Sequence, residues 1–88
     1  MTEKVRFNLG RTIEELGITR NKLAVESKTR PATVLDLVSG ETKRIEIHTL
    51  VNLLDALNTI AREQGITRKI TISDIIEYIP DDKNAETP

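Results

Sequence analysis

Apolar residues recur with helical spacing in two long stretches of the chain. The clearer pattern repeats an apolar residue every three or four positions and predicts a helix over about residues 47–64, which Gly65 ends. Its expected inward residues are Leu50, Leu53, Leu54, Leu57, Ile60 and Ala61. The other pattern predicts a helix over about residues 3–16, which Gly17 ends. Its expected inward residues are Val5, Leu9, Ile13 and Leu16.

Two shorter helices are predicted between these stretches. Thr19 is expected to cap a helix over about residues 20–27, because its hydroxyl can accept from the free N–H groups of the first turn. Pro31 suits the first turn of the next helix, about residues 31–39, and Gly40 closes that helix. The expected buried residues are Leu23, Ala24, Val34, Leu37 and Val38. Only about three residues join these two helices, so they are expected to cross steeply and closely.

The remaining segments alternate polar and apolar residues over short distances. Ile45 and Ile47 are expected to reach the core as an extended anchor. Residues 68–72 are rich in β-branched side chains and predict either a short strand or an extended strap. Ser73 is expected to cap a last short helix over residues 74–79. The elements together predict an all-α fold of five helices.

Length and composition bound the class of protein. At 88 residues the chain forms one domain, predicted over residues 1–80 with a polar tail at 81–88. Phe7 and Tyr78 are the only aromatic residues, so the core is expected to be aliphatic. The absence of cysteine excludes disulfides and thiolate metal sites and fits a cytoplasmic protein. There is no apolar run long enough to span a membrane, and the charged opening residues do not resemble a signal peptide.

The chain carries no recognisable catalytic constellation. His48 is the only histidine and has no neighbouring ligand cluster, so no metal site is expected. The neighbouring acids Glu14 and Glu15 point to different faces and do not form an acid/base pair. A glycine-rich phosphate loop and a nucleophilic triad are also missing from the sequence. We therefore expect a protein that is not an enzyme and needs no cofactor.

Charge is unevenly distributed, although the net charge is only −1. Residues 1–44 hold nine Lys or Arg and six Asp or Glu, a net of +3. Residues 45–88 hold four and eight, a net of −4. Such a dipolar domain can present its basic end to an anionic partner, although ordinary scatter of surface charges explains the difference equally well.

The sequence resembles the Cro/CI-type helix-turn-helix regulators of phages and bacteria, also called the XRE family. The resemblance covers about residues 5–80 and has no gaps between Thr19 and Asn58. It rests on Leu23-Ala24, Val34, Leu37, Ser39-Gly40-Glu41-Thr42-Lys43, Thr49-Leu50, Ala56-Leu57-Asn58 and Ile75-Ile76-Glu77-Tyr78-Ile79-Pro80. It implies a lambda-repressor-like domain that binds double-stranded DNA as a homodimer and regulates transcription, more often as a repressor.

The resemblance also implies a role for individual residues. The helix at 31–39 enters the major groove, with Pro31, Ala32 and Asp36 facing base edges. Arg30 and Thr33 lie beside them, near bases or phosphates. The phosphate contacts come from Arg20, Ser39, Lys43 and Arg44.

Two departures from the family pattern bear on this function. Lys28 stands where the family usually has glycine, so either the turn shifts or the domain carries about 1 kcal/mol of backbone strain. The base-facing positions are poor in hydrogen-bond donors: Ala32 can contact only a thymine methyl group, and Asp36 can accept only from cytosine. The alternative function is therefore a protein-interaction module on the same fold, of the anti-repressor or antitoxin kind.

A third departure concerns the dimer surface. Residues 59–71 are longer than the minimal connection of the family. One interpretation is a longer helix followed by a loop. The other is a dimer element, in which an exposed edge at residues 70–72 pairs with its two-fold mate. Contacts of the last two helices are a further candidate for the dimer surface.

Overall fold

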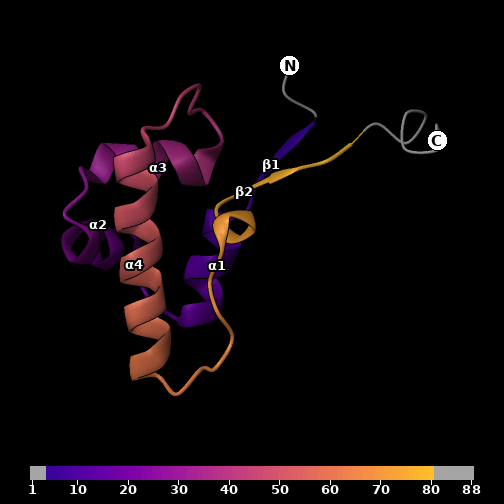
Figure 1. Ribbon diagram of the computed structural model, residues 1–88. Helices are drawn as coiled ribbons and strands as arrows, with labels where there is room; N and C mark the ends of the chain where they lie inside the picture. The colour runs from indigo at the N-terminus through magenta and orange to yellow at the C-terminus, as the bar shows by residue number, and fades with distance from the viewer. Residues whose placement is uncertain (1–3, 81–88) are drawn as a thin grey trace.

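The computed structural model describes residues 4–80, so the predictions made for residues 1–3 and for the tail at 81–88 lie outside the described part. It shows a mostly helical domain with a small two-stranded sheet (Figure 1). The elements, in chain order, are β1 (Val5–Phe7), α1 (Leu9–Leu16), α2 (Arg20–Ser27), α3 (Pro31–Ser39), α4 (Ile47–Glu63), the 3-10 turn η1 (Ile72–Asp74) and β2 (Ile76–Tyr78).

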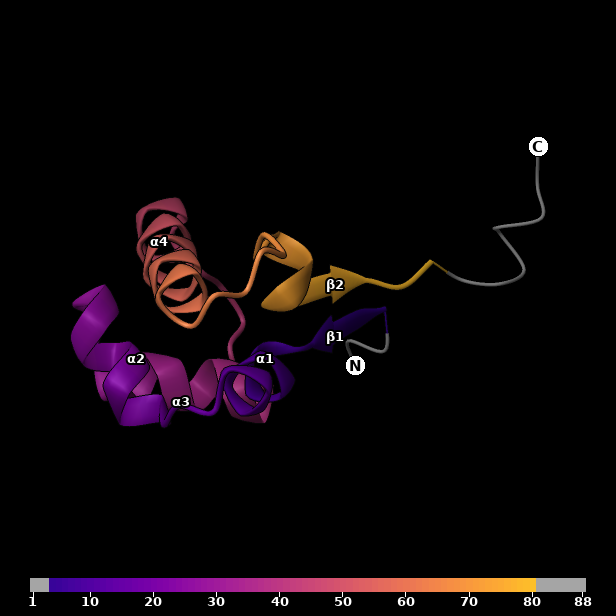
Figure 2. The same cartoon turned by 90° about the horizontal axis from the view of Figure 1, so that it is seen from below.

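The helices form a compact body from which the two strands project. Figure 2 shows α1, α2 and α3 on one side of this body, with α4 lying across them on the other. Strands β1 and β2 pair antiparallel and lead outward from the body, so the first and last described segments lie side by side. We call this pair the β1–β2 ribbon. Within residues 4–80, no helix combines the length and the apolarity needed to cross a membrane.

An aliphatic core joins all four helices to the segment before β2. Its largest fully buried side chains are Leu9, Leu23, Val34, Leu37, Leu53, Leu57 and Ile75. The inward residues predicted for the helix at 47–64 are buried, except Leu54, which is partly buried. The anchor prediction is half right: Ile45 packs against the core, but Ile47 lies in the first turn of α4 with 73% of its surface exposed.

The boundaries of the two short helices follow the sequence prediction. The Thr19 hydroxyl accepts from the Lys22 N–H at 3.0 Å and caps α2. Pro31 occupies the first turn of α3. The left-handed residues Gly17 (φ 67°) and Gly40 (φ 82°) end α1 and α3.

The first helix is shorter than predicted, because residues 5–7 form a strand. The partner strand comes from the far end of the chain, with Val5 opposite Tyr78 and Phe7 opposite Ile76. The pairing continues one residue beyond β1, where the Asn8 backbone N–H donates to the Ile75 carbonyl at 2.8 Å, and α1 begins at the next residue. Helical spacing of Val5 with Leu9 was therefore misleading, because a strand of three residues has no periodicity of its own to reveal it.

The predicted last helix at 74–79 is wrong. Thr71, not Ser73, is the capping residue, and it forms a reciprocal capping box with Asp74 around a single 3-10 turn. The chain then extends into β2. Its β-prone residues pair with β1 and so satisfy their backbone groups in a sheet rather than in a helix. The described chain therefore has four α-helices and a sheet, where five helices were expected.

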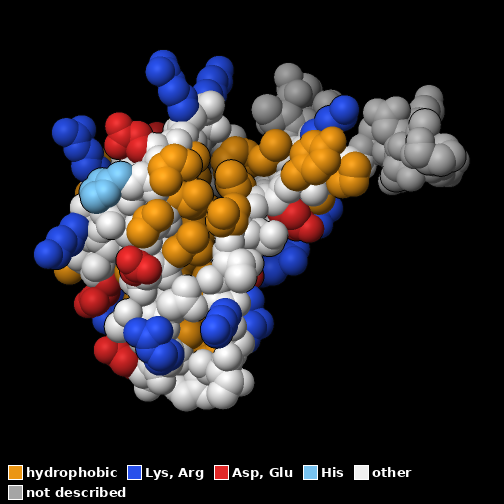
Figure 3. Space-filling view, viewed as in Figure 1, with side chains coloured by type: hydrophobic (Ala, Val, Ile, Leu, Met, Phe, Trp, Pro, Cys, Tyr) orange, Lys and Arg blue, Asp and Glu red, His pale blue; other side chains and the backbone are white. Residues whose placement is uncertain are grey.

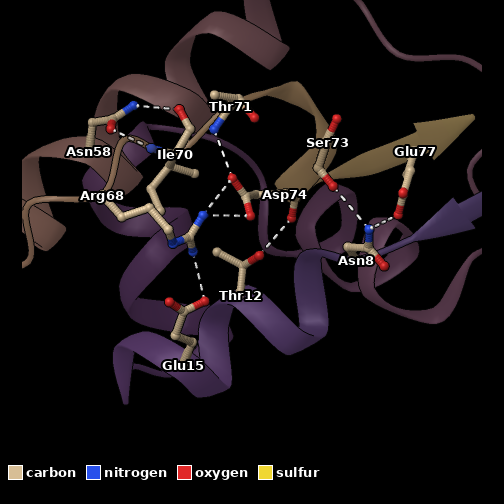
Figure 4. A network of polar contacts seen from close by, with 10 residues as sticks. All are labelled: Asn8, Thr12, Glu15, Asn58, Arg68, Ile70, Thr71, Ser73, Asp74 and Glu77. Carbon is tan, nitrogen blue, oxygen red and sulfur yellow. Dashed lines mark hydrogen bonds and ion pairs between the residues drawn. The ribbon is translucent and has the colours of Figure 1, made fainter.

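Residues 64–75 form a strap along the body that ends in the 3-10 turn η1. Its residues 66–71 form neither helix nor strand, so of the two predictions for 68–72 the strap is correct up to residue 71. Asn58 of α4 holds its middle: the Ile70 N–H donates to Asn58 Oδ1 at 2.8 Å, and Asn58 Nδ2 donates to the Ile70 carbonyl at 3.0 Å (Figure 4). Because Ile70 is only 4% exposed, the predicted free edge for dimer pairing is absent at this residue. Residues 59–63 continue α4 and residues 64–71 form the connection to η1, which agrees with the interpretation as a helix followed by a loop.

Polar side chains tie the end of the strap to α1. The Arg68 guanidinium contacts Glu15 at 2.7 Å and Asp74 at 3.0 Å, and these hydrogen bonds raise the pKa of Arg68 (Figure 4). The Thr12 hydroxyl donates to the Asp74 carbonyl at 2.7 Å. Asn8 Nδ2 donates to the Ser73 carbonyl and to the Glu77 carboxylate, each at 2.9 Å.

Candidate nucleic-acid interface

Helices α2 and α3 meet at a tight corner that only three residues, 28–30, connect. Lys28 adopts a left-handed conformation (φ 56°), in which any side chain with a Cβ is strained, so of the two predicted outcomes the domain carries the strain. Its cost is offset by hydrogen bonds: the Lys28 and Thr29 N–H groups donate to the Val25 and Ala24 carbonyls at 3.2 and 2.9 Å. We call α2, α3 and this connection the α2–α3 corner.

The inner side of the corner is apolar and tightly closed. Leu23 and Ala24 of α2, with Val34 and Leu37 of α3, are almost completely buried, as predicted. Ser27 is buried as well; its hydroxyl donates to the Leu23 carbonyl at 2.7 Å and lies 2.9 Å from the Thr29 hydroxyl. Because packing density is high on this side, α3 is held at a defined angle with its opposite side turned away from the core.

The outer face of α3 is exposed to solvent. It consists of the exposed residues Pro31, Ala32, Leu35, Asp36 and Ser39. Most of the residues predicted for DNA binding are on or beside it. Arg30 precedes the helix and is exposed, whereas Thr33 is only half-exposed. Ser39 donates its hydroxyl to the Asp36 carbonyl at 3.3 Å.

Arg20 lies beside this face, at the start of α2. A shallow hollow of about 350 Å³ separates the beginnings of α2 and α3, lined by Thr19, Arg20, Asn21, Pro31 and Leu35. We call it the α2–α3 hollow. Asn21 was not among the predicted site residues; the available signal was its place two residues after the predicted N-cap, in the same turn as Arg20.

Lys43 and Arg44 lie farther along, in the loop between α3 and α4. Both are exposed, and both line a groove of about 870 Å³ whose other wall is Val5, Phe7 and Ile76 of the ribbon. The structure thus groups the predicted residues in two places: the outer face of α3 with Arg20, and the loop that follows α3.

The corner carries unneutralised positive charge. Within residues 4–80 the ion pairs are Lys22 with Glu26 at 3.7 Å and the two contacts of Arg68. Asp36 therefore forms no ion pair with Lys43 or Arg44 in the described chain. Arg20, Arg30, Lys43 and Arg44 stay available to an anionic partner, while Asp36 places one negative charge on the outer face of α3.

Comparisons with known proteins add no identification. No family model matches the sequence, and no match was found among curated proteins or among solved structures.

Proposed function

We propose that this protein is a transcriptional regulator that binds double-stranded DNA, with α2 and α3 as its helix-turn-helix and α3 in the major groove. The observation that carries the proposal is the α2–α3 corner: a three-residue connection and a closed apolar inner side hold α3 with its outer face free. A single exposed helix supported in this way is the element that fits the width of the major groove.

The basic residues supply the phosphate contacts in this proposal. Arg20 approaches the backbone on one side of α3, and Lys43 and Arg44 approach it from the loop after α3. Arg30 and Thr33 read bases or contact phosphates beside them, and Asp36 accepts from cytosine where one lies opposite. Ser39 adds a neutral phosphate contact.

A homodimer completes the proposal, because two copies of α3 placed about 34 Å apart reach successive major grooves. Support comes from an exposed apolar face that runs from α4 to the ribbon (Figure 3). Large apolar side chains are exposed on α4 (Ile47 and Val51), on η1 (Ile72) and on β2 (Tyr78), at 46% to 73%. Apolar surface of this extent marks an interaction site. Sedimentation equilibrium of the protein and of Val51→Asp tests this step; a monomeric wild-type protein at micromolar concentration contradicts it.

Salt dependence of binding to random duplex DNA tests the function itself. Affinity should fall steeply between about 50 and 200 mM salt, because each phosphate contact releases counterions. The double variant Lys43→Ala/Arg44→Ala should lower the slope of log K against log salt by about 2 per protomer. Arg62→Ala/Lys69→Ala is the matched control. It removes the same charge at the other end of α4, a helix about 25 Å long.

The alternative function is a protein-interaction module on the same scaffold. The negative charge of Asp36, the shortage of donors on the outer face of α3 and the exposed apolar face favour it. Absence of duplex binding even at low salt supports this alternative and overturns the regulator. Equal salt slopes for the two double variants overturn the phosphate roles of Lys43 and Arg44 alone.

A further inference from the structure

The outer face of α3 is more apolar than an ordinary solvent-facing side of a helix. Three of its five residues, Pro31, Ala32 and Leu35, have no hydrogen-bonding side chain, and Leu35 is 46% exposed. None of the three is needed to fill the core, whose contacts from this helix come from Val34 and Leu37. The apolar residues therefore lie where a bound partner, not the domain itself, would cover them.

Two of these apolar residues, Pro31 and Leu35, line the α2–α3 hollow. Pro31 and Leu35 are four residues apart, so their Cβ atoms lie about 5–6 Å from each other on one side of the helix. They form the apolar part of the hollow, and Arg20 and Asn21 form its polar part from α2. A cation and an amide beside two apolar side chains match a ligand that is apolar at one point and anionic a short distance away.

A thymine in duplex DNA has this chemistry. Its C5-methyl group is the one apolar group that a base pair presents in the major groove, and the phosphates of the strand run beside it. We infer that Pro31 and Leu35 in the α2–α3 hollow, with Ala32 next to them, recognise thymine methyl groups while Arg20 binds the adjacent phosphate. This inference rests on the proposed function. It adds that the protein selects its DNA sites by the positions of thymine.

The thymine-to-uracil exchange tests the inference directly, because uracil lacks only the methyl group and keeps the base pairing and the O4 acceptor. A duplex is first selected from a random pool with the wild-type protein, and each thymine of its half-site is then replaced by uracil in turn. One or two positions per half-site should lose about fourfold in affinity, the effect of leaving one CH2-sized group unburied. The other positions should change little.

A variant cycle assigns the effect to Leu35. In Leu35→Ala the loss caused by uracil at the sensitive position should shrink towards onefold, and Leu35→Met, which keeps a long apolar side chain, should retain it. Val25→Ala is the matched control. Val25 is 67% exposed on α2 but does not line the hollow, so this variant should show the same uracil effect as the wild type. Circular dichroism confirms that each variant is folded.

Every outcome of this experiment is decisive. If no duplex is selected, the proposed function fails. Binding that is indifferent to uracil at all positions overturns the methyl recognition and leaves the regulator intact. A uracil effect that persists unchanged in Leu35→Ala, or that disappears equally in Val25→Ala, overturns the assignment to the hollow.

Discussion

The α2–α3 corner and the strap at residues 64–75 are both irregular joints between ordered elements, but different forces hold them. The corner is closed by apolar side chains of two helices that follow each other directly in sequence. The strap contributes only two almost completely buried side chains, Ile70 and Ile75. Otherwise it is held by polar contacts of Asn58, of Arg68 and of residues distant in sequence, with Thr12 and Asp74 lying 62 positions apart.

The difference shows how stability is distributed over a small domain. Separating packed apolar side chains exposes their surface to water and is costly in free energy. Breaking a few hydrogen bonds costs less, because the freed groups can bond to water instead. We therefore expect the strap to open locally while the corner opens only with global unfolding. Variants of the corner and of the strap test this expectation.

Removing a core side chain from the corner should be the most damaging change. Leu37→Ala deletes a fully buried leucine of α3 and should lower the free energy of unfolding by about 3 kcal/mol, through lost burial and the cavity that remains. Urea denaturation measures the change. Leu35→Ala on the same helix is the control and should change stability by less than about 0.5 kcal/mol. Equal effects of the two variants contradict the orientation of α3.

Removing the amide that holds the strap should cost less. Asn58→Ala leaves both backbone groups of Ile70 without their partner and should lower the free energy of unfolding by about 1–3 kcal/mol. Hydrogen exchange should accelerate at the Ile70 N–H more than at amides of the corner. Asn52→Ala, also on α4, loses only an exposed contact with His48 and serves as the control. The local role of Asn58 is wrong if both variants behave alike.

The left-handed residue of the corner offers a stabilising change. Lys28→Gly should raise the free energy of unfolding by up to about 1 kcal/mol, because glycine avoids the Cβ clash at φ 56° but loses more entropy on folding. The reciprocal change, Gly17→Ala, should destabilise by about 1 kcal/mol: a Cβ there meets no neighbour within 4 Å, so the cost is conformational. Thermal melts should show a higher midpoint temperature for Lys28→Gly and a lower one for Gly17→Ala than for the wild type.

The exposed ion pairs of the strap should matter least. Arg68→Met removes both contacts to Glu15 and Asp74 and should cost less than about 1 kcal/mol, because all three side chains are in part exposed to solvent. Since folding raises the pKa of Arg68, its contribution is complete below the unfolded-state pKa and is lost only as the pH rises through the folded value, in strongly alkaline solution. A difference in stability between the wild type and Arg68→Met that changes near neutral pH contradicts this expectation.

The same contrast explains how far the sequence could predict the fold. The corner follows from local signals, namely the cap at Thr19, Pro31 at the start of a helix and apolar spacing inside each helix, so its boundaries were predicted correctly. The strap and the ribbon depend on partners that are distant in sequence. Residues 5–7 form a strand because residues 76–78 pair with them, and neither segment carries a local signal for the other.

The candidate site divides in a similar way. The helical spacing predicts which residues are exposed once the buried sides of α2 and α3 are known: Arg20, Arg30, Pro31, Ala32, Asp36 and Ser39. The α2–α3 hollow could not be predicted, because it depends on the distance and angle between two helices rather than on the pattern of either one. Asn21 takes its significance from that geometry alone.

Pairing of β1 with β2 has a consequence for biosynthesis. A ribosome releases Val5 long before it releases Tyr78, so β1 has no partner until translation has passed the second strand. Helices α1 to α4 hold most of the apolar core and can pack together first. The four helices can therefore pack before the β1–β2 ribbon pairs, and anything that keeps β2 within the exit tunnel delays only this pairing.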